Sequence, residues 1–227
     1  SVPMINEKSL TSAAELINNA QKPFIVWGQG VILGNAENEF LNFINKSGIP
    51  AAWTILGLSA ISTDHPLNVG MLGMHGNYGP NKLTNECDLL IAIGMRFDDR
   101  VTGDLKTYAK QAKVIHFEID PAEINKNVKV DIPVLGNVKK TLKKILPLIK
   151  KKSHKKWVSK FRKLNDIEFN KVIDKEYNKK DGGISMAEVI KSVNNNTNGE
   201  SILVTDVGQH QMVACRYTKF NLSKSNI

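Results

Sequence analysis

The chain has 227 residues, of which 41% are apolar, enough for one sizeable hydrophobic core or one core and part of another. Its formal net charge of +9 comes from one segment, because residues 139–180 have a net charge of +12 and the rest of the chain has −3. No apolar run approaches the roughly 20 residues of a membrane span, no secretory signal is visible, and Cys87 and Cys215 support neither a disulfide framework nor a zinc site, so we expect a reduced, cytoplasmic setting.

Helical and strand-like patterns alternate along residues 9–149. The first helix is expected to begin at Ser12, whose spacing to Glu15 is that of a capping box. The next helix is expected to have Asn35 as its cap. Five segments, most of them continuous apolar runs, predict buried strands, at Pro23–Trp27, Ile49–Trp53, Asp88–Ile93, Lys113–Ile119 and Ile132–Leu135. This alternation predicts an α/β fold, a Rossmann-like parallel sheet with helices on both faces.

Two further zones follow this first domain. A helix from about Val138 closes this domain. The basic zone, residues 150–180, follows as a charged helix with a sparse apolar stripe made of Trp157, Phe161, Leu164, Val172 and Ile173. Asp181-Gly182-Gly183 should break that helix. A capping box of Ser185 and Glu188 then begins a helix to about Asn195, and Ser201–Thr205 predicts a buried strand. We therefore predict a domain at 1–149, a basic helical linker at 150–183 and a truncated second α/β unit at 184–227.

The loops after the predicted strands are the candidate site, because doubly wound sheets bind ligands beyond the carboxyl ends of their strands. The first such loop is Gly28-Gln29-Gly30-Val-Ile-Leu-Gly34, one residue longer than the nicotinamide fingerprint. No acidic residue ends the segment Ile49–Thr54 to hold a ribose. The glycines suit a tight turn as well as a ligand loop, and a standard NAD site is disfavoured.

Two later loops are more unusual. Gly70–Gly76 has three glycines in seven residues, with Met and His side chains that could line a flat ligand; a flexible turn with core methionines is the alternative. In Gly94–Gly103, Arg96 and Arg100 can bind phosphate or carboxylate oxygens, and an ion-pair cluster with the neighbouring aspartates is the alternative.

The remaining loops carry weaker signals. Glu118-Ile119-Asp120-Pro121 can accept hydrogen bonds from ribose hydroxyls, although Asp120 could equally cap a helix. Val207-Gly-Gln-His-Gln211 offers amide and imidazole donors that suit an anionic head group.

At these loops the sequence resembles the large, catalytic subunits of acetohydroxyacid synthases (acetolactate synthases), which are thiamine-diphosphate enzymes. The resemblance runs through most of residues 9–149 and again through 184–212. Its most specific elements are Gly70–Gly76, Arg96–Gly103, Glu118–Asn127 and Val207–Met212. The basic residues 150–180 correspond to the variable interdomain connection of the family.

The resemblance implies that the first domain binds FAD and that the second unit begins the thiamine-diphosphate domain. The implied FAD contacts are Gly28, Gly30, Thr54, Leu56, Leu72, Gly73, Met74, His75, Gly76, Gly94, Arg96, Arg100, Val101, Glu118, Ile119, Asn137 and Val138. Val207, Gly208, Gln209 and His210 match the loop that holds the phosphates of thiamine diphosphate, and Gln211 and Met212 would turn towards FAD. Arg100 would also neutralise the carboxylate of the second 2-oxo acid, with Met74 contacting the substrate.

The implied reaction is decarboxylation of pyruvate on thiamine diphosphate, then addition to pyruvate or 2-oxobutyrate, in the biosynthesis of branched-chain amino acids. The resemblance also implies a homodimer or homotetramer of the full-length chain and a regulatory small subunit. An activating glutamate would precede Ser1 and the Mg²⁺ ligands would follow Ile227, so the chain alone is expected to be inactive.

Other functions are less well supported by the sequence. Glyoxylate carboligase, a sister FAD-containing enzyme, is the alternative that the Arg96–Arg100 loop leaves open. A nucleic-acid-binding module on residues 139–180 is disfavoured because few aromatic residues interleave with the lysines and the glycine loops would go unexplained. No membrane partner is expected.

Overall fold

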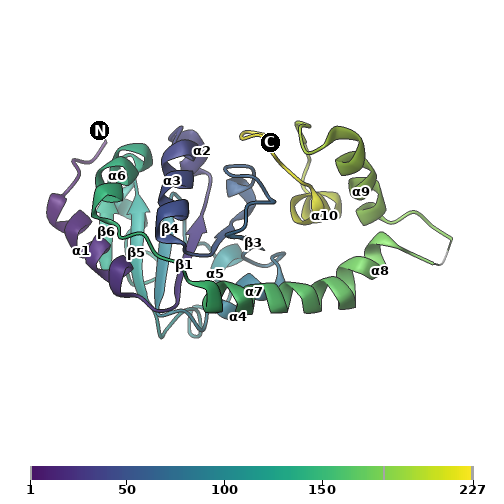
Figure 1. Ribbon diagram of the computed structural model, residues 1–227. Helices are drawn as coiled ribbons and strands as arrows, with labels where there is room; N and C mark the ends of the chain where they lie inside the picture. Colours follow the sequence, from purple (N-terminus) through teal and green to yellow (C-terminus); the bar gives the residue numbers. More distant parts are fainter. Residues whose placement is uncertain (1, 181, 226–227) are drawn as a thin grey trace.

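A computed structural model describes residues 2–180 and 182–225 and shows a six-stranded parallel sheet with the order β3-β2-β1-β4-β5-β6 (Figure 1). The strands are β1 (Pro23–Trp27), β2 (Ala51–Trp53), β3 (Asn68–Met71), β4 (Leu89–Ile93), β5 (Lys113–Glu118) and β6 (Ile132–Leu135). Because β1 has β2 on one side and β4 on the other, a topological switch point lies between β1 and β4. The predicted fold class is confirmed.

The predicted strands agree with the structure except at the edge. β1 and β6 have the predicted bounds, and the other three predicted strands differ by one or two residues. The edge strand β3 was not predicted, because it is short and contains Asn68 and Gly70, residues that strands usually lack. Gly70 has a φ of +114°, which a side chain would resist.

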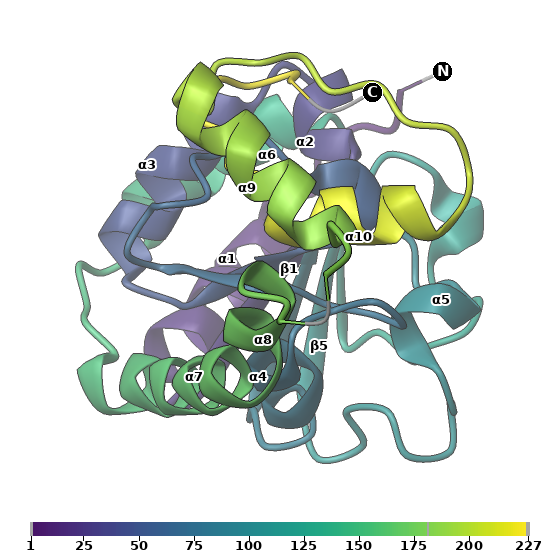
Figure 2. The same cartoon turned by 90° about the vertical axis from the view of Figure 1, so that its right-hand side faces the viewer.

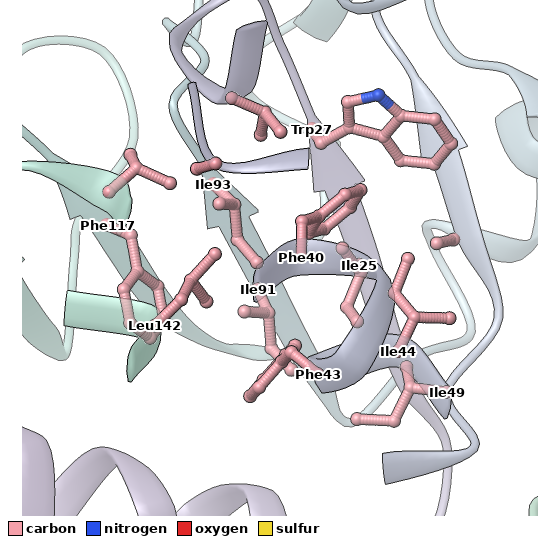
Figure 3. Packing of buried hydrophobic residues seen from close by; sticks show 14 of the residues in the cluster. Ile25, Trp27, Phe40, Phe43, Ile44, Ile49, Ile91, Ile93, Phe117 and Leu142 are labelled. Atoms are coloured by element: carbon pink, nitrogen blue, oxygen red, sulfur yellow. The ribbon is translucent and has the colours of Figure 1, made fainter. Parts of the chain in front are cut away.

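One face of the sheet is covered by α1 (Glu7–Asn19), α3 (Glu37–Ser47) and α6 (Val138–Ile145). Their buried side chains meet those of β1, β4 and β5 in the larger core cluster. Figure 3 shows the part of this cluster between α3, α6 and the three strands. Trp27 and Phe40 are completely buried there, with ring centroids 5.2 Å apart. The Trp27 indole N–H donates to the carbonyl of Gly57 at 2.8 Å, so its one polar atom is satisfied.

Two predicted helix caps are wrong. The first helix begins five residues before Ser12, because the Asn6 side chain accepts hydrogen bonds from the backbone N–H groups of Lys8 and Ser9, at 2.9 and 3.3 Å. Asn35 does not cap α3; it has a φ of +48° and ends the preceding turn, and Ala36 is the residue at the N-cap.

The other face of the sheet is covered by α4 (Tyr78–Leu83) and α7 (Lys155–Glu168). In α7, Trp157 donates its indole N–H to the carbonyl of Pro23 at 2.9 Å, and the ring of Phe161 lies 5.0 Å from that of Phe24. The first part of the basic zone therefore completes the core of the sheet domain. The predicted apolar stripe ends within α7, since Val172 is 39% exposed.

Beyond α7 the helix continues as a π-helical segment, Phe169–Ile173, and α8 (Asp174–Tyr177), which lead away from the sheet (Figure 1). The predicted capping box of Ser185 and Glu188 is confirmed at the start of α9 (Met186–Thr197), which packs beside α10 (Gln209–Tyr217) (Figure 2). Asp181, the first residue of the predicted helix break, lies outside the described residues.

The predicted strand Ser201–Thr205 is wrong. Only Leu203 forms a strand-like bridge, through its N–H to the carbonyl of Ser225 at 2.7 Å, and Ile202 and Val204 are exposed. An apolar run becomes a buried strand only where neighbouring strands pair with it, and among the described residues this unit has no such neighbour. None of the helices in the described ranges is both long enough and apolar enough to cross a membrane.

Candidate functional site

A cavity of about 740 Å³ lies at the carboxyl edge of the sheet, in the size range of small-molecule sites. Residues at or just beyond the ends of all six strands line it, together with residues of the second unit. The predicted site residues that line it are Gly28, Gly30, Thr54, Leu56, Leu72, Gly73, Met74, His75, Gly94, Arg96, Arg100, Val101, Glu118, Ile119, Asn137, Val138, Val207, Gln211 and Met212. Gly76, Gly208, Gln209 and His210 do not line it.

The glycine loops after β1 and β4 pack directly on each other at the switch point. The N–H of Gly30, at the start of α2 (Gly30–Leu33), donates to the carbonyl of Gly94 at 2.8 Å. A Cβ atom on Gly30 would lie 2.6 Å from the Cα of Gly94, and one on Gly28 would lie 2.6 Å from the Cβ of Met95. The tight-turn interpretation therefore accounts for these glycines, which also form part of the cavity wall.

The loop after β3 contacts the short helix α5 (Asp99–Thr102). Gly73 has a φ of +118°, and the next residue, Met74, donates its N–H to the carbonyl of Arg100 at 2.7 Å. One guanidinium nitrogen of Arg100 lies 3.7 Å from the sulfur of Met74. The structure thus brings together the two residues for which the family resemblance implies a substrate contact.

The ion-pair cluster considered for Arg96 and Arg100 is not present. Asp98 caps α5 instead, since its carboxylate accepts a hydrogen bond from the N–H of Val101 at 3.2 Å. Among the described residues, no carboxylate lies within 4.0 Å of either guanidinium group. Both arginines are exposed and face the cavity without an internal counter-charge, which leaves their forked N–H groups available to an anion.

Glu118 and His116 form a buried group under the cavity. One Glu118 oxygen accepts the N–H groups of Ile119 and Asp120, at 2.8 and 3.1 Å, and the other lies 3.6 Å from Nε2 of His116. Nε2 is 2.8 Å from the carbonyl of Met95 and must donate to it, so in the neutral ring Nδ1 is unprotonated, and it has no hydrogen-bond partner among the described residues. Burial lowers the pKa of His116, outweighing the raising effects of the Met95 carbonyl and Glu118.

Two other candidate residues cap helices. Asp120 accepts a hydrogen bond from the N–H of Ala122 at 2.9 Å, so the helix-cap interpretation of Asp120 is confirmed. Asn137 accepts the N–H of Lys140 at 3.2 Å and caps α6. Each cap points the start of a helical segment towards the carboxyl edge of the sheet.

Acidification should destabilise the fold through His116. Because its folded-state pKa lies below the ordinary 6.5, the unfolded chain binds a proton first as the pH falls. The free energy of unfolding should therefore decrease below pH 6.5, by up to about 1.4 kcal/mol per pH unit for each such histidine. The pKa values of His65 and His154, also lowered by burial, act in the same direction.

Urea unfolding at pH 7.5, 6.5 and 5.5 measures this dependence. The variant His116→Gln should show a shallower loss of stability between pH 6.5 and 5.5 than the unchanged chain. His210→Gln, which removes an exposed imidazole, is the control. An identical slope in the His116 variant and the unchanged chain would contradict the assignment.

Six other lining residues lie in the predicted loops but were assigned no ligand contact: Gln29, Leu33, Gly34, Met71, Met95 and Asp98. Sequence reasoning missed Ile55, which lies outside those loops. Five large apolar side chains around the cavity are between 45% and 84% exposed: Leu33, Leu56, Met74, Ile119 and Val207. Exposed apolar side chains gathered around one hollow are typical of a ligand site. No group of three or more metal-ligating side chains is found in the described part of the chain.

The fold and the site define a doubly wound α/β domain with a ligand cavity at its switch point. Residues 10–145 match the central domain of thiamine pyrophosphate enzymes, and the chain belongs to this family. This confirms the resemblance seen in the loop motifs.

Relatives support the same conclusion. The chain is 38% identical to the acetolactate synthase large subunit of Buchnera aphidicola subsp. Schizaphis graminum, over 95% of this chain and 38% of the relative. It is 37% identical to a probable acetolactate synthase large subunit of Methanococcus aeolicus (96% and 38%) and 35% identical to an acetolactate synthase of Mycobacterium bovis (97% and 36%). The chain thus spans less than two fifths of the length of these relatives.

Proposed function

We propose that this chain is the cofactor-binding middle part of an acetolactate synthase large subunit and that its cavity binds FAD. In the whole protein it would serve the thiamine-diphosphate-dependent condensation of two pyruvates, or of pyruvate with 2-oxobutyrate, to acetohydroxy acids. The observation that carries the proposal is a single cavity, lined from all six strands, in a chain whose relatives bear the name of that enzyme.

The residues around the cavity fit a dinucleotide. The cavity reaches from the end of β3 to the end of β6, and five strand spacings of about 4.8 Å make an edge of about 24 Å. A ligand that touches both ends must be long. Arg96 and Arg100, which have no carboxylate partner among the described residues, suit phosphates. The apolar side chains suit a flat ring, and the second Glu118 oxygen suits a ribose hydroxyl. By the family resemblance, FAD bound here would undergo no net redox change.

The substrate and the second cofactor would lie beside the second unit. Arg100, next to Met74, would neutralise the carboxylate of the second 2-oxo acid. Val207, Gly208, Gln209 and His210 form the entry to α10, where the first N–H groups of a helix lack internal partners and suit the phosphates of thiamine diphosphate. We assign no Mg²⁺ ligand to this chain.

Flavin titration tests the proposal. The purified chain should bind FAD saturably, and the change in flavin fluorescence measures this binding. Arg96→Gln and Arg100→Gln each remove a charge-assisted hydrogen bond, worth about 1.5–3 kcal/mol, and should raise the Kd roughly 10- to 150-fold. Lys106→Gln, which removes an exposed positive charge outside the cavity, is the control. Absence of saturable binding would contradict the FAD assignment, and unchanged affinity in both arginine variants would contradict their roles.

A further inference from the structure

A buried carboxylate at the end of α7 joins two parts of the chain that lie far apart in sequence. Glu168 is only 6% exposed. One of its oxygens accepts the side-chain N–H of Asn77 at 3.2 Å and the backbone N–H of Tyr78 at 3.0 Å. The other oxygen pairs with the guanidinium of Arg216 in α10. Both carboxylate oxygens of Glu168 therefore have hydrogen-bond or ion-pair partners.

On one side, Glu168 anchors the glycine loop that carries Met74. Asn77 closes that loop, because its side chain accepts the N–H of Met71 at 2.9 Å and its own N–H donates to the carbonyl of Met71 at 2.8 Å. Asn165, one turn earlier in α7, donates to the carbonyl of Val69 at 3.1 Å. The end of α7 therefore fixes both the strand and the loop that follows it.

On the other side, Glu168 anchors α10. Arg216 lies in the last turn of this helix, and Gln211 and Met212, one turn or more before it, line the cavity. A terminal guanidinium nitrogen of Arg216 makes the pair with Glu168, its one carboxylate partner among the described residues, whereas the buried Nε atom has no hydrogen-bond partner there. A single carboxylate thus connects the two elements that bring Met74 and Met212 to one cavity.

Core stability alone does not explain this arrangement. A buried ion pair loses about as much by desolvation as it gains by attraction, and apolar residues of similar size are often at least as stabilising. What an ion pair with added hydrogen bonds does provide is one defined geometry. We propose that Glu168 is a positioning residue of the cavity, which holds the loop after β3 and helix α10 at a fixed separation. The positioning role itself is independent of the proposed function; only the identity of the ligand that the cavity binds rests on it.

The two parts are also joined elsewhere, which supplies a matched control. The backbone of Phe220 exchanges hydrogen bonds with Thr63, at 3.0 and 3.1 Å, and an exposed ion pair of 3.3 Å joins Lys219 to Asp64. Breaking the Glu168 group should therefore loosen α10 without detaching the second unit. Asp64→Asn breaks an ion pair between the same two parts, but at the surface, where such pairs contribute little.

Amide hydrogen exchange of the purified chain, without flavin, tests the inference. In Glu168→Gln, the new amide group presents a donor to Arg216 or Asn77, and exchange should become at least tenfold faster in residues 70–78 and 209–217. Strands β1, β4 and β5 should keep their protection, and Asp64→Asn should match the unchanged chain. Arg216→Gln leaves the Asn77 and Tyr78 hydrogen bonds in place, so it should speed exchange in 209–217 alone; it also serves if Glu168→Gln does not fold.

Flavin titration of the same variants separates this inference from the proposed function. If the chain binds FAD, Glu168→Gln should raise the Kd at least fivefold and Asp64→Asn should not. If the chain does not bind FAD but exchange changes as described, the positioning role stands and the FAD assignment fails. Exchange in both segments that is the same in Glu168→Gln and Asp64→Asn would overturn the inference.

Discussion

Replacing Phe161 with alanine should lower the free energy of unfolding by about 3–5 kcal/mol, the range for removing a buried aromatic ring. Phe161 is completely buried, and its ring lies 5.0 Å from that of Phe24 in β1 and 5.1 Å from that of Trp157. A loss of this size is a large part of the stability of an ordinary domain. It would show that the basic segment is part of the fold of the sheet domain.

The matched control is Phe169→Ala. Phe169 directly follows α7 but is 45% exposed, and this substitution should change the unfolding free energy by less than about 0.5 kcal/mol. Urea unfolding followed by tryptophan fluorescence measures both, since Trp27, Trp53 and Trp157 all lie in the sheet domain or on it. Similar, small effects of the two substitutions would mean that α7 does not contribute to this core.

Gly94→Ala should combine a large loss of stability with a loss of ligand binding. Gly94 has a φ of +57°, where a non-glycine residue costs about 1–2 kcal/mol. Its Cβ would also lie 2.8 Å from the Cα of Gly30, and overpacking of this kind costs about 1–3 kcal/mol. Relief of the contact must push the loops after β1 and β4 apart, which alters the cavity wall at the switch point.

Gly103→Ala is the control for the backbone contribution, because it changes a glycine of positive φ without creating a steric contact. Gly103 has a φ of +58° and a ψ of −130°, a conformation that also disfavours a side chain, but among the described residues no atom lies within 4 Å of the position that a Cβ would take there. The Gly103→Ala variant should therefore be destabilised by its backbone conformation alone and should keep its flavin affinity. The two variants are compared by urea unfolding and by flavin titration. A flavin affinity of Gly94→Ala that is unchanged, as is expected for Gly103→Ala, would show that the contact between the glycine loops does not shape the cavity.

The sequence predicted the central sheet well because its strands are covered on both faces. Continuous apolar runs such as Leu89–Ile93 can be recognised without knowledge of their neighbours. The wrong strand predictions concern segments whose structure depends on neighbouring strands. β3 pairs only at the edge, and Ser201–Thr205 has the composition of a strand but no partner among the described residues. The two misassigned caps, Ser12 and Asn35, show that the capping residue depends on where the folded helix begins, which the local spacing of residues does not determine.

The candidate site was predicted where glycines and charges follow a strand. That pattern identified Gly30, Gly94 and Arg100, all of which line the cavity. It could not identify Glu168 or His116, because a single charged residue in a helix or a single histidine in a strand has no distinctive local pattern. Their surroundings come from residues about 20 to 90 positions away, which only the folded chain brings together.

The π-helical segment Phe169–Ile173 has a consequence for how the second unit is oriented. A π-helical turn holds one more residue than an α-helical turn, and each residue of an α-helix advances the chain by about 100°. The wide turn absorbs the extra residue, so deleting one residue here would restore regular winding and leave everything after α8 at nearly the same rotation about the helix axis, whereas deleting one residue from α7 would rotate it by about 100°. The π-helical segment is therefore the part of this helix where a one-residue insertion or deletion would change the orientation of the second unit least.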